Sequence, residues 1–474
     1  MTSPAHGITK RKSAPMTIIA SAAASTPRPL PVPADAKLGA MDVPDVSYAR
    51  SGDVAIAYQV VGEGATDLVI FPFLSNIWSL WHLPAFGDFG RRVARGRRVI
   101  LVNPRGAGLS DRPRGFTVES RMDDLLAVME AVGSERASLL GIAEAAATCA
   151  VFAASYPERV DRLVLFGPYA RGAKDEEERQ AMQERLRAER DLWGTREYLE
   201  EMGRRINPQW ADDENYLNWF VWHHRLTSSP ASIFEFRRMQ LDLDVSDVLP
   251  AIRVPTLVLS KDPLLEESAE VASLIPGAHH VRVPGRGMAI MENDFALEAI
   301  EDFLGGAPAR HIPDSVLATL LFTDLVGSTE RAAELGDRRW RELLAQQRLL
   351  VRRELERYRG SEVDTAGDGF FARFDGPARA IACARQVIDG TRGLGLELRA
   401  GIHTGECELV DGKPAGLSVH VGARVSARAG PGEVLVTGTV KDLVAGSGIA
   451  FEPRGEHELK GVPGAWPIYA VSDD

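Results

Sequence analysis

The chain has 474 residues, of which 45% are apolar and 26% charged, and at about 150 residues per domain this length predicts two or three domains. Its 55 Lys and Arg residues against 66 Asp and Glu residues give a formal net charge of −11, which disfavours bulk binding to nucleic acids. The most apolar window, residues 68–81, is shorter than the roughly 20 residues that span a bilayer. The sequence therefore predicts neither a nucleic-acid-binding protein nor an integral membrane protein.

Cysteine usage and the N-terminal residues bear on where the protein resides. The three cysteines are widely spaced, which argues against a disulfide framework or a four-ligand zinc site and favours the reducing cytoplasm. A basic triplet at residues 10–12 precedes a mildly apolar stretch at 16–24, as in a signal peptide, but that stretch is short and rich in Ala, Ser and Thr. We therefore expect a cytoplasmic protein with a disordered tail over residues 1–45.

Residues 46–304 have the pattern of an α/β domain. Short strand-like apolar runs alternate with helical periods, which predicts a parallel sheet with buried strands. The predicted strands lie at residues 68–72, 98–103, 137–141, 163–166 and 256–260. Between residues 174 and 248 the pattern changes to charged helices, which we interpret as a helical lid over the carboxyl end of the sheet.

Aromatic residues are concentrated in this predicted lid, namely Trp210, Tyr216, Trp219, Phe220 and Trp222. Two interpretations of them stay open. The side chains can form the ordinary apolar core of the lid, or they can line a pocket that binds a small apolar molecule or an acyl chain.

A second domain is expected over residues 315–474, after a Gly- and Pro-bearing linker at 305–314. It opens with a buried strand at 317–323. A helix follows, whose apolar residues keep a period near 3.6 until Gly360, which we expect to end it. An Asp-Gly pair at 368–369, between two apolar runs, predicts a β-hairpin.

Two aspartates of the second domain are candidate metal ligands. Asp324 follows the predicted buried strand, and Gly327, Ser328 and Thr329 then start a helix whose backbone N–H groups can face phosphate oxygens. Asp368 lies at the tip of the predicted hairpin, whose strands would pair beside the strand that ends at Asp324. Taken singly, each aspartate is more often a turn or helix-cap residue. Together, two adjacent carboxylates can bridge two Mg²⁺ or Mn²⁺ ions for phosphoryl displacement.

Residues 315–474 resemble a class III adenylate/guanylate cyclase domain, because several separated motifs occur in the order of that family. The two metal aspartates of the family match Asp324 and Asp368. Its transition-state arginine matches Arg424, and its triphosphate-binding lysine matches Lys460. The resemblance implies a ferredoxin-like α+β fold and the conversion of ATP to 3′,5′-cyclic AMP and pyrophosphate. It also implies two Mg²⁺ or Mn²⁺ ions per site and a homodimer whose sites form across the interface.

Two features depart from the pattern of this family. His420 stands where the family commonly has a ribose-orienting asparagine, four residues before Arg424; a neutral imidazole can still make one hydrogen bond, or His420 merely packs. The base-recognising lysine and aspartate of the family correspond here to Asp364 and Lys413, as though exchanged, and a small alignment shift brings in Asp411 instead. Such a pair can read adenine or guanine. We therefore expect ATP as the substrate, with GTP as the alternative.

Residues 46–304 resemble the α/β-hydrolase family in a loop at 102–111, a turn at 156–160 and a strand at 257–259. The whole chain resembles actinobacterial signalling proteins in which this fold is fused to a class III cyclase. Such a resemblance implies the fold but not the hydrolytic activity, which depends on individual catalytic residues.

The catalytic residues of the hydrolase family are degenerate in this chain. Ala143 replaces the nucleophile in the turn Gly-Ile-Ala-Glu-Ala at 141–145, and Met288 replaces the histidine that acts as general base. Asp262 remains as a candidate acid, and Phe73 replaces the usual glycine of the oxyanion loop. We therefore expect a hydrolytically inactive domain with a regulatory or ligand-sensing role.

Three functions are compatible with these patterns. The first is a homodimeric, metal-dependent cyclase with a degenerate regulatory domain. The second is a cyclase-like domain that binds nucleotide without turnover, and the third is a hydrolase with a cyclase-like regulator. The presence of both metal aspartates together with Arg424 and Lys460 favours the first function over the second, while Ala143 and Met288 argue against the third.

Overall fold

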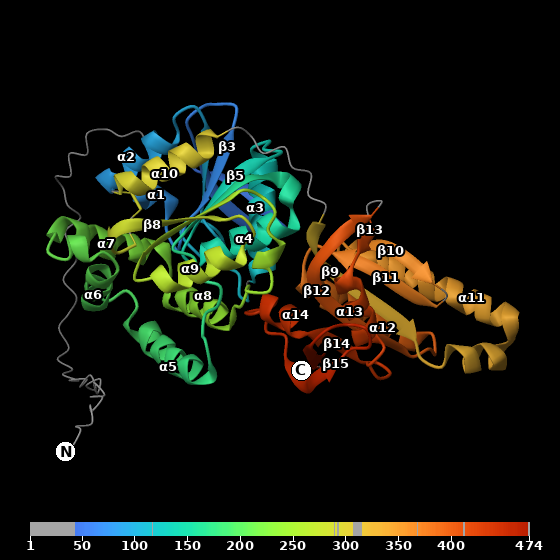
Figure 1. Ribbon diagram of the computed structural model, residues 1–474. Coiled ribbons are helices and arrows are strands. Elements are labelled where there is room, and N and C mark those ends of the chain that lie inside the picture. Colours follow the sequence, from blue (N-terminus) through green and yellow to red (C-terminus); the bar gives the residue numbers. More distant parts are fainter. Residues whose placement is uncertain are drawn as a thin grey trace, which may run out of the picture. The chain divides into compact units, whose positions relative to one another are not determined.

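The computed structural model of the chain describes residues 43–115, 117–288, 290–291, 293–306, 315–366, 368–410 and 413–472. Most of the predicted tail and of the predicted linker, as well as Asp411, lies outside the described residues. Within these ranges the strands form two separate sheets, one from residues 47–286 and one from residues 315–471 (Figure 1).

The first sheet is predominantly parallel, as the sequence predicts. Its strand order is β1-β2-β4-β3-β5-β6-β7-β8, and the antiparallel pairings join β1 to β2 and β2 to β4. The five strands predicted from apolar runs are β3 to β7, whereas the sequence pattern does not reveal β1, β2 and β8. The strands are β1 (Ser47–Ser51), β2 (Val54–Val61), β3 (Asp67–Phe71), β4 (Arg98–Val102), β5 (Ala137–Ile142), β6 (Val160–Phe166), β7 (Thr256–Asp262) and β8 (His279–Arg286).

Helices cover both faces of this sheet and bury two apolar clusters against it. One cluster involves α3 (Val118–Ala131), α4 (Ala145–Ser155) and α9 (Leu265–Leu274). The other involves α1 (Ile77–Leu80), α2 (Pro84–Val93) and α10 (Asp294–Gly305).

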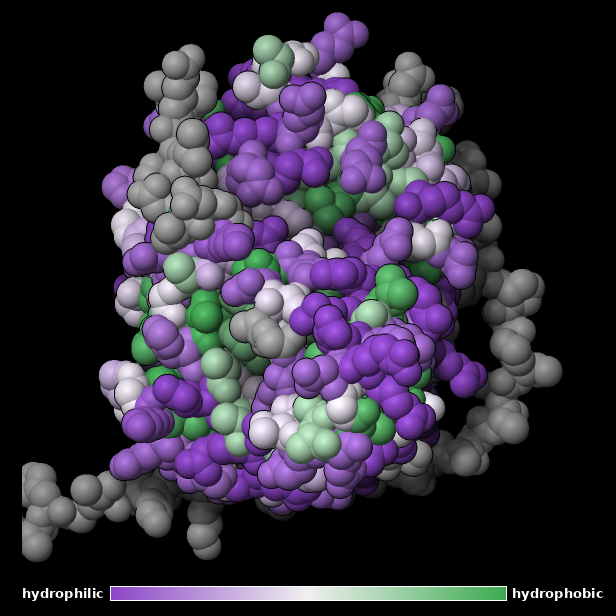
Figure 2. Space-filling view, turned by 90° about the vertical axis from the view of Figure 1, so that its right-hand side faces the viewer, coloured by the Kyte–Doolittle hydropathy of each residue, from purple (hydrophilic) through white to green (hydrophobic). Residues whose placement is uncertain are grey.

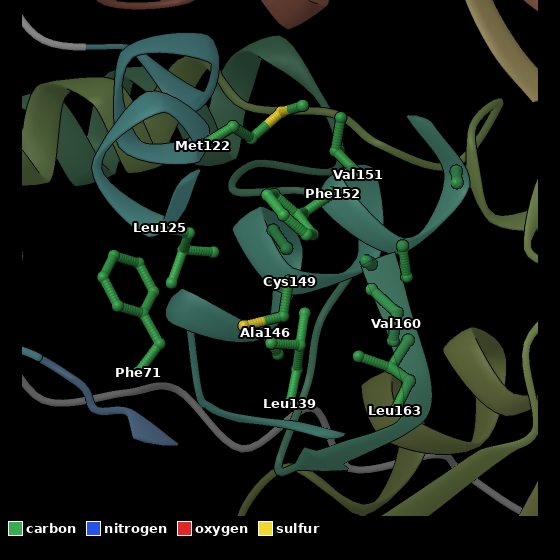
Figure 3. Close-up of a cluster of buried hydrophobic side chains, with 14 of the residues drawn as sticks. Phe71, Met122, Leu125, Leu139, Ala146, Cys149, Val151, Phe152, Val160 and Leu163 are labelled. Carbon is green, nitrogen blue, oxygen red and sulfur yellow. The ribbon is translucent and has the colours of Figure 1, made fainter. Parts of the chain in front are cut away.

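Cys149 lies inside the first of these clusters. Figure 3 shows it on α4 among Leu125, Leu139 and Phe152. Burial raises the pKa of the Cys149 thiol to about 12, so the thiol stays protonated at neutral pH. The residue therefore serves packing and does not supply a nucleophile in place of Ala143.

The predicted lid is helical. It comprises α5 (Glu176–Leu192), α6 (Arg196–Ile206), the short 3₁₀ turn η2 (Pro208–Trp210), α7 (Glu214–Thr227) and α8 (Pro230–Asp242). Of the five aromatic residues that the sequence analysis singles out in it, Tyr216 and Phe220 are buried. Trp210 and Trp219 are only partly buried, and Trp222 is exposed. The interpretation of the lid aromatics as ordinary core therefore holds for some of them only.

The second sheet has the order β10-β11-β9-β12-β14-β16-β15, with β13 paired to β12. Residues 366 and 369 pair across the turn between β10 and β11, which confirms the predicted hairpin. Its strands are β9 (Ser315–Leu325), β10 (Ser361–Ala366), β11 (Gly369–Phe374), β12 (Leu398–Val410), β13 (Lys413–Ala415), β14 (Val434–Thr437), β15 (Phe451–Glu458) and β16 (Ala465–Val471). Its helices are α11 (Ser328–Arg357), α12 (Pro377–Gly393), α13 (Leu417–Ser426) and α14 (Gly438–Leu443).

Side chains of β9 alternate between the two faces of this sheet, as the twofold period of a strand requires. Leu321 packs in a cluster with residues of α11 and α12, whereas Leu320 belongs to a separate cluster with Cys407. The central strand is therefore buried on both sides.

The left-handed residue that follows helix α11 is not Gly360, the residue that the sequence pattern indicates. The left-handed residue is Arg359, with φ 57°, and the Gly360 N–H donates a hydrogen bond to the Leu355 carbonyl at 2.8 Å. Gly360 is required for a different reason, because a Cβ atom there would lie 2.6 Å from the ring of Phe374. The expectation that Gly360 itself ends the helix is corrected accordingly.

Figure 2 shows a face of the protein on which hydrophilic residues predominate and hydrophobic residues lie in small separate groups. Across the part of the chain that the structure describes, every helix is too short or too polar to cross a membrane.

Candidate active site

Asp324 lies at the carboxyl end of β9, directly opposite Arg399 of β12. The Arg399 guanidinium donates to Asp324 Oδ2 from Nη2 at 2.5 Å and from Nε at 3.1 Å. The side chain of Asp324 is 40% exposed, so the carboxylate is open to solvent while it is paired. Sequence reasoning missed Arg399, because its only signal is a register between strands that are distant in the chain.

Asp368 lies in the turn between β10 and β11. Strand β11 pairs with β9 so that Phe370 faces Thr323, which brings the hairpin tip beside the end of β9 that carries Asp324. The Oδ2 atom of Asp368 is buried and has no hydrogen-bond partner among the described residues. A buried carboxylate oxygen without a partner is unfavourable unless a cation or donor meets it.

The two aspartates fit an open site for a divalent cation. Both lie at the same end of adjacent strands, and oxygen ligands are the ones that Mg²⁺ and Mn²⁺ prefer. In the described ranges no cluster of three or more His, Cys, Asp or Glu side chains could hold a metal ion. The protein donors are therefore fewer than in a closed structural site, and Mg²⁺ commonly completes its coordination with water and substrate phosphates.

Helix α11 begins three residues after the end of β9, as predicted. Its N-cap is Gly327 in a left-handed conformation with φ 65°, and no side chain caps the helix. The first backbone N–H groups of an α-helix have no partner within the helix, and this end carries partial positive charge. Ser328 and Thr329 form the first helical positions, so the segment after Asp324 has the structure of an anion-binding helix start.

The structure brings Arg424 and Lys460 together. Arg424 lies in the last turn of α13, and its Nε donates to the Lys460 carbonyl at 3.2 Å. Both side chains are exposed. Arg399 also donates from Nη1 to the Ala427 carbonyl at 3.3 Å, so it joins the carboxylate of Asp324 to the residue that ends α13.

Two glycines allow α13 to approach the sheet closely. A Cβ atom on Gly401 of β12 would lie 2.1 Å from the Ser426 backbone nitrogen, and a Cβ atom on Gly422 would lie 2.7 Å from the ring of Phe322. The short separation fixes the height of α13 above β9 and β12. The position of Arg424 relative to the sheet is therefore determined by backbone packing rather than by a flexible loop.

The remaining predicted substrate-binding residues lie farther apart. His420 is exposed on α13, one helical turn before Arg424. Asp364 is exposed on the edge strand β10, where its Oδ1 accepts from the Thr365 N–H at 2.9 Å. Lys413 pairs with residue 410, beyond the end of β9 opposite to Asp324. Among the described contacts none joins Asp364 to Lys413, and the role of this pair in base recognition stays a prediction.

The predicted nucleophile turn of the first domain retains its strained backbone without a nucleophile. Ala143 connects β5 to α4 with φ 53°, and its N–H donates to the Phe166 carbonyl at 2.9 Å. A Cβ atom on Gly141 would lie 2.7 Å from the Ala146 Cα, so Gly141 is needed where α4 passes over the strand. The backbone geometry of a nucleophile elbow is preserved, but the alanine at its centre cannot act as a nucleophile.

The other two triad positions do not form an acid–base pair. Asp262 Oδ2 accepts from the Arg286 Nε at 3.0 Å, and both side chains are well exposed. Met288 packs against Gly167, because a Cβ atom added to Gly167 would lie only 3.0 Å from the Met288 Cε. A thioether cannot accept a proton at neutral pH, so these residues cannot activate a hydroxyl group.

Two charged side chains that sequence reasoning missed are buried beside the elbow. Glu144 follows Ala143 and is 1% exposed, and Arg121 of α3 is fully buried. The Arg121 Cζ lies 4.9 Å from the ring centroid of Phe71 and 5.5 Å from that of Phe236, and its guanidinium has no hydrogen-bond partner in the described structure. Burial raises the pKa of Glu144 to about 8, although the positive charge of Arg121 opposes this shift. No local pattern signals these two residues.

Ser79 and His223 form a serine–histidine pair that the sequence does not reveal. Their Oγ and Nδ1 atoms are 2.8 Å apart, and both residues are buried. Burial lowers the pKa of His223 well below its ordinary value. The bond connects α1 to α7, and the burial of Ser79 favours this structural role over nucleophilic catalysis.

Two segments of the chain match known domain families. Residues 75–212 match the family model described as alpha/beta hydrolase fold. Residues 313–473 match the one described as adenylate and guanylate cyclase catalytic domain. Both resemblances that the sequence motifs indicate are thereby confirmed.

Individual relatives each match one part of the chain. A putative carbamate hydrolase RutD from Caulobacter sp. (strain K31) is 28% identical over 223 residues, which cover 45% of this chain and 82% of that protein. A 2-hydroxy-6-oxo-6-phenylhexa-2,4-dienoate hydrolase from Comamonas testosteroni is 34% identical over 136 residues, 27% of this chain and less than half (45%) of that protein. The crystal structure of the adenylyl cyclase CyaB from P. aeruginosa is 22% identical with a TM-score of 0.33, covering 34% of this chain and 95% of that one.

Proposed function

We propose that this chain, which joins an α/β-hydrolase-fold domain to a class III nucleotide cyclase domain, converts ATP to 3′,5′-cyclic AMP and pyrophosphate. The observation that carries the proposal is the buried, unpartnered Oδ2 of Asp368 beside Asp324. Asp324 directly precedes the uncapped start of α11, and α13, which carries Arg424, packs against the same sheet. The two domains would span residues 46–304 and 315–474.

Asp324 and Asp368 would hold the metal ions. When bound, two Mg²⁺ or Mn²⁺ ions lower the pKa of the ribose 3′-hydroxyl and neutralise phosphate charge. The backbone N–H groups that start α11, at Ser328 and Thr329, would donate to phosphate oxygens. Because α11 begins close behind Asp324, one short segment would supply both the carboxylate and these donors.

The cationic side chains would act on the phosphates. Arg424 would donate to oxygens of the α-phosphate, where charge develops during attack by the 3′-hydroxyl. Lys460 would neutralise the leaving pyrophosphate. The hydrogen bond from Arg424 Nε to the Lys460 carbonyl supports this assignment, because it holds the two residues beside each other while both side chains are exposed.

We further propose that the active form is a homodimer with two equivalent sites. In the family that the motifs resemble, the metal aspartates of one protomer meet the arginine of the other. The exposure of Arg424, His420 and Lys413 is compatible with such sharing, because each side chain is open to a second protomer. A C2 dimer would then contain two complete sites, and a monomer would contain none.

Base recognition is proposed to rest on Asp364 and Lys413. A carboxylate can accept from the adenine N6 amine while an ammonium donates to N1, and the same pair can read guanine. ATP is the substrate in this proposal. Guanylate cyclase activity and nucleotide binding without turnover are the alternatives. His420 would orient the ribose through one hydrogen bond.

The hydrolase-fold domain is proposed to be catalytically inactive and to regulate or sense. Ala143, Met288 and the Asp262–Arg286 ion pair support this part of the proposal. Hydrolysis of 4-nitrophenyl esters tests it, because turnover that is lost on substitution within residues 141–145 would contradict it. A cytoplasmic location is proposed as well, since the cysteines are free and buried.

The cyclase proposal is tested by incubating the purified chain with ATP and Mn²⁺ and measuring cyclic nucleotide against an Asp324→Ala control. Cyclic AMP from the natural chain and none from the control are expected. Equal ATP and GTP concentrations in one reaction decide the base preference, and a clear excess of cyclic GMP would establish the guanylate alternative. Nucleotide binding without any cyclic product would establish the non-catalytic alternative.

A further inference from the structure

A cleft of about 340 Å³ opens at the lid. Its lining includes Trp210 of η2, Tyr216 and Trp219 of α7, and His82 from the end of the α1 segment. None of Ala143, Asp262 or Met288 contributes to it. The volume lies in the range of small-molecule sites, near its lower end.

The aromatic walls of this lid cleft are held in place at their polar ends. The rings of Trp210 and Tyr216 have centroids 4.8 Å apart, and those of Tyr216 and Trp219 are 6.1 Å apart. The Tyr216 hydroxyl accepts from Asn207 Nδ2 at 2.7 Å, and Trp219 Nε1 donates to the Ser79 carbonyl at 3.1 Å. The polar groups of Tyr216 and Trp219 are already hydrogen-bonded. A ligand in the cleft can therefore contact only the carbon atoms of these two rings.

The charge in the lid cleft is negative. Asp213 is exposed and lines the cleft, while its Oδ1 caps α7 by accepting from the N–H groups of Asn215 and Tyr216 at 2.9 and 3.2 Å. Its Oδ2 has no hydrogen-bond or ion-pair partner in the described residues. The described lining contains no lysine or arginine to neutralise this carboxylate.

A second polar atom of the lining also lacks a partner. His82 Nδ1 is buried and makes no hydrogen bond within the described structure. The imidazole packs against the rings of Trp78 and Trp222, with centroids 4.6 and 5.1 Å away. These contacts hold the imidazole, which lines the cleft, in place beside a ligand.

We propose that the lid cleft binds a compact organic cation, such as a quaternary ammonium or a protonated alkylamine that carries a hydroxyl group. The faces of aromatic rings attract a cation that enters a partly desolvated site, and quaternary ammonium groups are recognised in this way. Asp213 supplies the opposing charge, and His82 meets the hydroxyl group. A purely apolar ligand would make no use of the charge of Asp213, so a cation explains more of the lining than the apolar molecule that one of the two sequence interpretations offers.

Choline and its neutral isostere 3,3-dimethyl-1-butanol are suitable probes, because they share shape and differ in charge. Titration of the full chain, followed by tryptophan fluorescence and calorimetry, is expected to give saturable choline binding at least about tenfold tighter than binding of the alcohol. Equal affinity for the two would overturn the proposal in favour of an apolar pocket. The absence of saturable choline binding at millimolar concentration would also overturn it.

Asp213→Asn removes the charge and keeps a good N-cap, so α7 should remain folded. This variant is expected to weaken choline binding at least about tenfold while leaving the weak binding of the alcohol unchanged. Asp212→Asn is the matched control, because this neighbouring aspartate does not line the cleft, and it should bind choline like the natural chain. Equal losses in both variants would contradict a specific role of Asp213. These measurements record binding alone and do not depend on cyclase activity.

Discussion

Arg399 lies directly opposite Asp324 across β12 and β9, and its guanidinium donates two hydrogen bonds to one oxygen of that carboxylate. Both side chains are partly exposed, so the pair contributes at most about 1 kcal/mol. A cation that binds Asp324 therefore has to share the carboxylate with Arg399 or displace it.

Replacing Arg399 by glutamine should strengthen binding of Mn²⁺ to the nucleotide-free protein by roughly two- to fivefold, because a competing positive charge is removed. Calorimetric titration with Mn²⁺ measures the change. Arg392→Gln is the control, since this exposed arginine pairs with Asp389 outside the candidate site. Weaker Mn²⁺ binding by Arg399→Gln would show that the arginine orients the carboxylate rather than competing for it.

The Asp368→Asn variant separates function from stability. Loss of a metal ligand should lower cyclase activity by about two orders of magnitude. Stability should be unchanged or slightly higher, because the substitution removes charge from a buried oxygen that lacks a partner. Product formation and thermal unfolding of the same preparation test both statements. Loss of activity that accompanies a large loss of stability would mean that Asp368 is a structural residue.

A shared site predicts complementation between two inactive variants. Asp368→Asn and Arg424→Ala each damage every site of their own homodimer. After unfolding and refolding as an equal mixture, half of the dimers should be mixed, and each of these should contain one intact site out of two. The mixture should therefore show about one quarter of the natural activity in a cyclic nucleotide assay. Activity no higher than that of the separate variants would place the complete site within one protomer.

The sequence predicts those parts of the fold that depend on local patterns. The apolar runs of β3 to β7, the hairpin at 368–369 and the start of α11 after Gly327 each follow from neighbouring residues. The pairing of Arg399 with Asp324 depends on a strand register across 75 residues, which no local pattern specifies.

Burial of charged residues is equally hidden in the sequence. Glu144 and Arg121 have the residue types of a protein surface, and only packing of α3 and α4 against the first sheet encloses them. The lid shows the same limit: its aromatic residues could be recognised, but the cleft beside Asp213 depends on how η2 and α7 meet the segment at His82.

Glu144→Gln should change how stability depends on pH. The pKa of Glu144 is raised by burial to about 8 in the folded chain, against an ordinary value of 4.5. The folded state therefore holds a proton that the unfolded state releases, and the free energy of unfolding falls as pH rises from about 4.5 through about 8. The slope from this group is on the order of 1 kcal/mol per pH unit. Urea unfolding between pH 5 and 8 should show a flatter profile for Glu144→Gln than for the natural chain, whereas the exposed control Glu158→Gln should follow the natural profile.

Ala143→Gly should stabilise the hydrolase-fold domain. Ala143 has φ 53°, and a left-handed conformation costs a non-glycine residue on the order of 1 kcal/mol. Glycine adopts this conformation without strain, so the free energy of unfolding should rise by up to about 1 kcal/mol, reduced by the larger backbone entropy that glycine loses on folding. Ala147→Gly in the interior of α4 is the matched control and should destabilise by about 1 kcal/mol, because its backbone is helical. Chemical unfolding of both variants measures whether the free energy of unfolding rises for Ala143→Gly and falls for Ala147→Gly. If Ala143→Gly destabilised the domain as much as Ala147→Gly, the strained elbow would not be retained in solution.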